Sequence, residues 1–111
     1  MGDDFCFVSY FFSIDGNRLY FISTRPKKGK EGASDWDIWY VEKTGKRWSE
    51  AKNIGPPVNS DKDEYYVSLT KEKTIYFASN RKGGYGSFDI YCSEFVGGKY
   101  LKPKNLGTAV N

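Results

Sequence analysis

The sequence predicts an all-β protein made of two copies of one antiparallel unit. Aromatic residues make up 18% of the 111 residues and the chain holds 12 glycines, a composition that favours strands and turns. A strand-like segment, LYFISTR at 19–25, returns almost unchanged as IYFASNR at 75–81. No segment shows a helical period, because turn-forming residues recur too often along the chain.

The sequences around the repeated segment also match. DIWY at 37–40 corresponds to DIYC at 89–92, and KNIGPPVN at 52–59 corresponds to KNLGTAVN at 104–111. The copies differ mainly in the length of one loop, a change that repeated units tolerate. We therefore expect two structural units, residues 2–58 and 59–111.

Runs of aromatic and β-branched residues between turn signals predict four strands in each unit. The strands expected in the first unit are 5–12, 18–23, 37–42 and 47–53. Those expected in the second unit are 65–69, 74–79, 89–94 and 99–105. Four antiparallel strands repeated at a spacing of about fifty residues are typical of β-propeller blades.

Turn residues mark the connections between these strands. Asp15-Gly16 joins the first two strands of the first unit, because glycine accepts a positive φ. Thr44-Gly45-Lys46 and Gly97-Gly98 lead into the two fourth strands. Lys71-Glu72-Lys73 stands at the first turn of the second unit and contains no glycine, a departure that the pattern does not explain.

Several of these segments resemble a known repeat. SIDGNRLYFISTR at 13–25, IYFASNRKGGYGSFDIY at 75–91 and KNLGTAVN at 104–111 are similar to the WD40-like (PD40, TolB-type) β-propeller repeat family of bacterial envelope proteins. The resemblance covers nearly the whole chain. It implies two four-stranded antiparallel β-propeller blades, as a partial propeller or as a unit of an oligomeric one, in the periplasm or cell envelope. It implies no single activity, because propellers carry many functions.

Charge and hydropathy limit the partners. The net charge of +3, from 17 basic and 14 acidic residues, is too mild to indicate nucleic acid, and the basic loop at 25–32 has no aromatic residue among its lysines. No apolar run approaches the roughly 18 residues of a membrane span. The chain begins Met1-Gly2-Asp3-Asp4, without the basic and apolar segments of a signal peptide.

Catalytic chemistry has little support in the sequence. The chain has no histidine, which excludes Ser-His-Asp and Cys-His devices. The densest acidic group, Asp61, Asp63 and Glu64, lacks the glycine and terminal glutamate of a calcium loop. We expect it to be a solvated turn between the units, with a calcium site as the alternative. The expectation is therefore no enzyme, no cofactor and no metal beyond that alternative.

The two cysteines, Cys6 and Cys92, occupy non-equivalent positions of the two copies. We expect two small residues that pack in the interior. A disulfide between them stays open, because the sequence does not say whether their geometry permits one. A metal site on two cysteines without histidine is not expected.

A charged pair brackets the same loop in each copy. Arg25 and Asp37 stand at its two ends in the first unit, and Arg81 and Asp89 do so in the second. A bidentate guanidinium–carboxylate pair would close the loop, so we expect a structural brace in both copies. The first copy departs from the second at Phe7, which stands where the second copy has Glu64.

Two kinds of function remain. The first is a non-catalytic structural and protein-interaction scaffold whose partners are other proteins, the remaining blades of a longer chain, or further copies of this one, with three copies preferred. The second is a small lectin-like module that binds carbohydrate or peptidoglycan through loop aromatics. Trp36 and Tyr85 are the candidates for that second function, because they lie in loops rather than at repeated strand positions.

Overall fold

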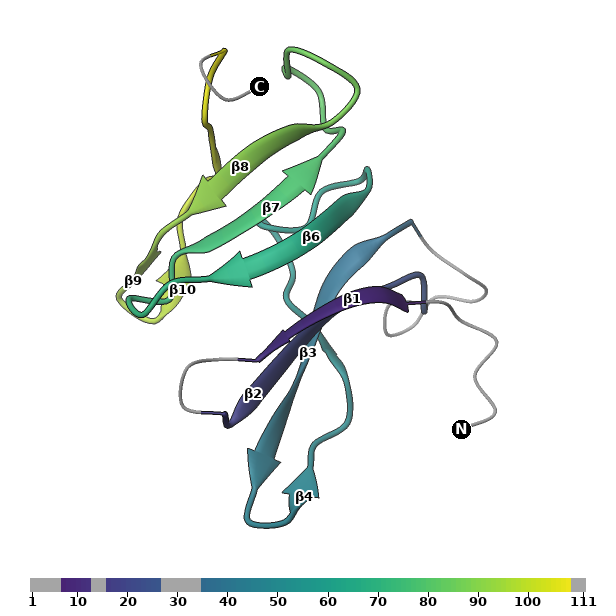
Figure 1. Ribbon diagram of the computed structural model, residues 1–111, viewed down its shortest axis with the longest axis vertical. Helices are drawn as coiled ribbons and strands as arrows, with labels where there is room; N and C mark the ends of the chain where they lie inside the picture. The colour runs from purple at the N-terminus through teal and green to yellow at the C-terminus, as the bar shows by residue number, and fades with distance from the viewer. Residues whose placement is uncertain (1–6, 13–15, 27–34, 109–111) are drawn as a thin grey trace.

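The computed structural model describes residues 7–12, 16–26 and 35–108, with 7–12 as backbone only (Figure 1). The strands of the first half are β1 (Phe7–Phe12), β2 (Arg18–Ser23), β3 (Asp37–Thr44), β4 (Arg47–Trp48) and β5 (Lys52–Asn53). Those of the second half are β6 (Glu64–Leu69), β7 (Ile75–Ser79), β8 (Asp89–Ser93), β9 (Phe95–Val96), β10 (Lys99–Tyr100) and β11 (Lys104–Asn105). The prediction of an all-β fold with antiparallel sheets is confirmed, and neither sheet closes on itself. In these residues no helix has the length and apolar character to cross a membrane.

Each half of the chain forms one antiparallel sheet. In the first sheet β1, β2 and β3 are neighbours, β5 pairs with β3, and β4 forms a hairpin with the end of β3. In the second sheet the order is β6, β7, β8 and β11, while β9 and β10 form a separate two-stranded ribbon. The strands therefore follow the same plan in both halves.

The prediction of a single fourth strand at 47–53 and at 99–105 is wrong. Each is two short strands, of which the first folds back as a hairpin arm and the second returns to the edge of the sheet. In the second half Pro103 lies at the break and has no N–H with which to continue a ladder. Ala51 takes the corresponding place in the first half, where nothing in the structure explains the break.

The two sheets share one hydrophobic core, with the second sheet lying beside the first and β6 in contact with β1, β2 and β3 (Figure 1). Val58, in the connection between the halves, is 1% exposed and packs into it. Complete burial of one aliphatic or aromatic side chain contributes about 1.5–3 kcal/mol. The buried residues of the core are Tyr20, Ile22, Ile38, Val58, Val67, Ile75, Phe77 and Tyr91.

The two sheets contribute opposite faces to this core. Phe77 and Tyr91 are paired across β7 and β8, and their rings stack at 6.1 Å; we name their side the front face. The corresponding pair in the first sheet is Phe21 and Trp39. The core residues of the first sheet lie on its opposite side, which we name the back face. Because successive strand residues point to opposite faces, the front of the second sheet lies on the back of the first. The back of the second sheet therefore points away from the core.

A shared core predicts that the two halves unfold together. Ile38→Ala in the first sheet and Ile75→Ala in the second should each lower the free energy of unfolding by about 2–5 kcal/mol, because both side chains are fully buried. Val96→Ala is the control, since Val96 is 55% exposed. Urea unfolding should show one transition in every variant. Two transitions, with each alanine affecting only one, would contradict the shared core.

Candidate functional site

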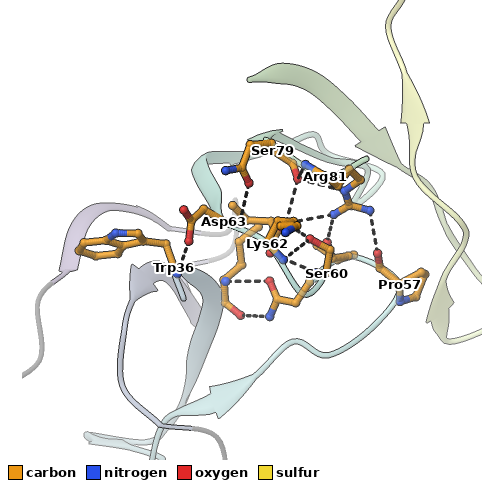
Figure 2. A network of polar contacts seen from close by, with 12 residues as sticks. Trp36, Pro57, Ser60, Lys62, Asp63, Ser79 and Arg81 are labelled. Carbon is orange, nitrogen blue, oxygen red and sulfur yellow. Dashed lines mark hydrogen bonds and ion pairs between the residues drawn. The ribbon is translucent and has the colours of Figure 1, made fainter. Parts of the chain in front are cut away.

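A network of polar contacts joins the two sheets where the second half begins (Figure 2). Asn59 is 6% exposed, and its side chain pairs with the backbone of Ile38 on β3. The Ile38 N–H donates to Asn59 Oδ1 at 2.8 Å, and Asn59 Nδ2 donates to the Ile38 carbonyl at 2.9 Å. Nδ2 also donates to Asn53 Oδ1 at 2.8 Å. The amide of Asn59 therefore serves both backbone polar groups of Ile38, which are shielded from water.

A second set of bonds ties the start of β3 to the start of β6. Asp63 Oδ1 accepts from the Trp36 N–H at 2.9 Å (Figure 2). The Trp36 carbonyl accepts from the Glu64 N–H at 2.8 Å. The Asp63 N–H donates to Asn80 Oδ1 at 2.8 Å, which connects the same point to the end of β7. Contacts from Asn59 and Asp63 thus fix β3 against the second sheet; with Glu64 and Arg81 we name them the polar joint.

The carboxyl group of Glu64 is fully buried inside the polar joint. It accepts from Ser60 Oγ at 2.6 Å, from the Ser60 N–H at 3.1 Å and from Ser79 Oγ at 2.9 Å. Burial raises the pKa of Glu64 to about 7, although the bonds from both serines and the charge of Arg81 favour the carboxylate. Glu64 is therefore a buried acid that titrates near neutral pH.

Arg81 closes the joint from the other side and reaches back to the connection between the halves. Its Nη1 donates to the Pro57 carbonyl at 3.2 Å, and its Nη2 donates to the Val58 carbonyl (Figure 2). Nη2 lies 3.4 Å from Glu64 Oε2, and Nε donates to Ser79 Oγ at 3.0 Å. The planar guanidinium can serve all these acceptors because its donors point in fixed, divergent directions.

The structure gives Arg81 and Asp89 different partners from those of the predicted brace. The ion pair of Arg81 is with Glu64 of the same sheet, and its guanidinium also donates to the Pro57 and Val58 carbonyls of the connection between the halves. Asp89 organises the loop by itself: it accepts from the Tyr85 N–H and from the Gly86 N–H, the latter at 3.1 Å. Backbone N–H groups are local and need no second charge, which makes the predicted pairing unnecessary.

Two neighbours complete the surroundings of Asp89. Asn105 Nδ2 on β11 donates to Asp89 Oδ2 at 2.8 Å, and the pKa of Asp89 is lowered, first by the Tyr85 N–H and also by Asn105. Gly84 packs so closely that a Cβ there would lie 2.6 Å from Asp89 Oδ2. The loop at 82–88 therefore requires glycine next to its carboxylate.

The first sheet repeats part of this arrangement. Arg25 donates from N and Nε to Ser23 Oγ at 3.1 and 3.3 Å, as Arg81 does to Ser79. Asp37 accepts from Asn53 Nδ2 at 3.1 Å, as Asp89 does from Asn105. The brace between Arg25 and Asp37 stays a prediction, because most of the loop that it would close, 27–34, lies outside the described residues.

The residues expected to bind a ligand or calcium are not gathered in one place. Trp36 packs its ring on Tyr65 at 5.8 Å between the sheets, whereas Tyr85 is 62% exposed in the loop at 82–88. Asp63 and Glu64 accept separate bonds in the polar joint, and Asp61 is exposed. Across the described ranges, no group of three or more His, Cys, Asp or Glu side chains is placed to hold a metal ion.

The structure describes only one of the two cysteines. Cys92 on β8 is a free, half-buried thiol. Cys6 lies outside the described residues.

No protein-family model, curated protein or solved structure matches the chain.

The titration of Glu64 predicts how stability depends on pH. The native pKa of about 7 lies above the ordinary value of 4.5, so between these values the native state binds more protons than the unfolded chain. Its contribution to stability is complete below pH 4.5 and is lost as the pH rises through 7, with a slope of at most about 1.4 kcal/mol per unit.

Urea unfolding measured from pH 4.5 to 8 tests this dependence. Glu64→Gln keeps the shape of the side chain and should remove the fall in stability between those limits. Glu94→Gln is the control, because the Glu94 side chain is 54% exposed, and it should keep the profile of the parent protein. If Glu64→Gln and the parent protein have parallel profiles, Glu64 does not titrate near neutral pH.

Proposed function

We propose that the chain is a non-catalytic structural and protein-interaction module of the β-propeller repeat type. The proposal is supported by how the polar side chains of the joint are used. Glu64, the buried acid with the strongly raised pKa, is surrounded by donors from Ser60, Ser79 and Arg81 and is closed to solvent. A perturbed carboxyl group in an open cleft would favour catalysis, whereas a closed one favours a structural role.

The observation that carries the proposal is an apolar pocket on the outside of the second sheet. This outer pocket has a volume of about 260 Å³ and is lined by Tyr65, Tyr66, Ala78 and Phe88. Tyr66 is 73% and Phe88 is 42% exposed. Exposed aromatic side chains around an apolar hollow are typical of protein-binding surfaces.

The first sheet indicates what covers such a surface. Ile22 corresponds in the sequence to Ala78, and Trp36 corresponds to Phe88. In the first sheet Ile22 is fully buried in the shared core, and Trp36 packs against Tyr65 of the following sheet. The matching positions of the second sheet line the outer pocket, so another sheet of the same kind is the partner that fits.

The backbone conformation of Tyr66 also supports a partner on the outer pocket. Tyr66 has a φ of 55° and lies in the bulge between Tyr65 and Ser68, where β6 loses its register with β7. A residue other than glycine in this conformation costs about 1 kcal/mol or more, and bulges redirect side chains at functional edges. Because Tyr66 is 73% exposed, its burial within the chain offsets little of that cost.

The partner that we favour is a second copy of this chain, which would place the front of its first sheet on the outer pocket. That front carries Phe21 and Trp39, which are buried beneath Arg25, as the front of the second sheet carries Phe77 and Tyr91 beneath Arg81. Such contacts are head-to-tail and form a ring when the rotation closes. Three copies would make six blades, and further blades of a longer chain would cover the same face. A place in the bacterial cell envelope follows from the repeat that the sequence resembles.

The proposal predicts self-association that depends on Tyr66. Light scattering coupled to size exclusion should show a mass that rises with concentration toward three chains. Tyr66→Gly should keep or raise the melting temperature, because glycine accepts the positive φ, and should leave a monomer. Tyr85→Ala is the matched control, because Tyr85 is also exposed but lies outside the outer pocket. A folded monomer of the parent protein throughout the micromolar range would contradict the proposal.

Carbohydrate binding remains a second candidate, because Tyr85 is 62% exposed on a loop. Titration with peptidoglycan fragments and simple sugars, followed by calorimetry, tests it. Binding that Tyr85→Ala abolishes and Tyr66→Gly leaves intact would favour the lectin-like function.

A further inference from the structure

A second cavity lies at the other ends of the strands from the polar joint. Its volume is about 550 Å³, within the range of ligand sites, and its lining comes from the ends of β2 and β3 and from the turn that joins β6 to β7. Tyr20 and Leu69 form part of its lining, and polar groups are supplied by Asn17, Thr44, Ser49 and Thr70. Both sheets contribute to its walls, so the cavity exists only in the stacked pair.

The charges around this cavity are mostly positive. Among the described lining residues, five are cationic and one, Glu42, is acidic. Glu42 accepts from Arg18 at 2.7 Å and from Lys52 at 2.9 Å, and these bonds, first that of Lys52, lower its pKa. The cationic residues are Arg18, Lys43, Lys52, Lys71 and Lys73, and we name this cavity the cationic cleft.

Three of these lysines have no acidic partner among the residues that the structure describes. In the parts of the chain that the structure describes, no ion pair joins Lys43, Lys71 or Lys73 to an acidic side chain. Lys43 stands on the wall from the first sheet, and Lys71 and Lys73 stand on the wall from the second. Glu72, between the latter two, is exposed and is not part of the lining. Like charges on both walls of a hollow concentrate the field in the space between them.

The backbone of Lys73 provides an independent observation. Its φ is 70°, and its N–H donates to the Thr70 carbonyl at 3.0 Å in the turn that joins β6 to β7. The matching turn of the first sheet has Gly16 at a φ of 74°. Glycine adopts this conformation freely, whereas a lysine is strained there, and such strain is concentrated at functional sites. What the lysine adds to this turn is a positive charge at the mouth of the cleft.

We propose that the cationic cleft binds a ligand that carries several closely spaced negative groups and bridges the two sheets. The shared chemistry is that of phosphate or carboxylate oxygens, which lysine and arginine recognise by charge-assisted hydrogen bonds. Arg18 and Lys52, already held by Glu42, form the ordered end of the site. Lys43, Lys71 and Lys73 supply the uncompensated charge. A phosphorylated small molecule and an acidic oligosaccharide are two sources of this chemistry.

Calorimetric titration with inorganic pyrophosphate and with trigalacturonate separates the two sources. One of them should bind, and its affinity should fall as salt is raised, because added ions screen exposed charges. Lys71→Gln should weaken binding by about fivefold, the loss expected of one partly exposed ion pair. Lys73→Gly should weaken it by a similar factor while the melting temperature stays the same or rises. The binding does not depend on self-association, so Tyr66→Gly should bind like the parent protein.

The control variant is Lys102→Gln, since Lys102 is exposed and lies outside the cleft. It should bind like the parent protein. The proposal is overturned if neither probe binds at millimolar concentration, or if Lys102→Gln weakens binding as much as Lys71→Gln and Lys73→Gly do.

Discussion

The stacking of the two sheets depends on buried polar groups whose partners lie across the boundary between the halves. Asn59 serves the N–H and the carbonyl of Ile38, and Trp36 bonds through its N–H to Asp63 and through its carbonyl to the Glu64 N–H. A buried polar group without a partner costs about 1–3 kcal/mol, so sliding one sheet on the other would be penalised at several atoms together. Hydrophobic burial brings the sheets together, and these bonds select one position.

The same constraint accounts for the two surfaces on which the functional proposals rest. Fixing the front of the second sheet on the back of the first leaves the back of the second exposed, with Tyr66 and Phe88 around the outer pocket. It also sets the ends of the strands apart, so that lysines from both sheets face one cleft. Tyr66 and Lys73, the two non-glycine residues with positive φ in the described part of the chain, stand at these two surfaces.

Features that depend on the local sequence pattern could be predicted from the sequence, whereas features that depend on contacts between distant residues could not. The strand at 18–23 and the antiparallel order follow from alternation and turn residues, which are local. The partner of Arg81 could not be predicted, because Glu64 comes close only in the register that places it opposite Ser79 across β6 and β7. Asn59 was visible as a polar residue at the boundary, but its role needs the position of Ile38. At the strained turn of Lys73, the sequence shows only that a glycine is absent.

Hydrogen exchange of the Ile38 amide tests the central claim, that the polar joint makes the stacked sheets one cooperative structure. This N–H has Asn59 Oδ1 as its acceptor, so it is protected only while the joint is intact. It should exchange as slowly as the amide of Phe77 in the middle of the second sheet, through complete unfolding. Exchange of Ile38 at the rate of an exposed loop, with Phe77 still protected, would mean that the joint opens independently and would contradict the account.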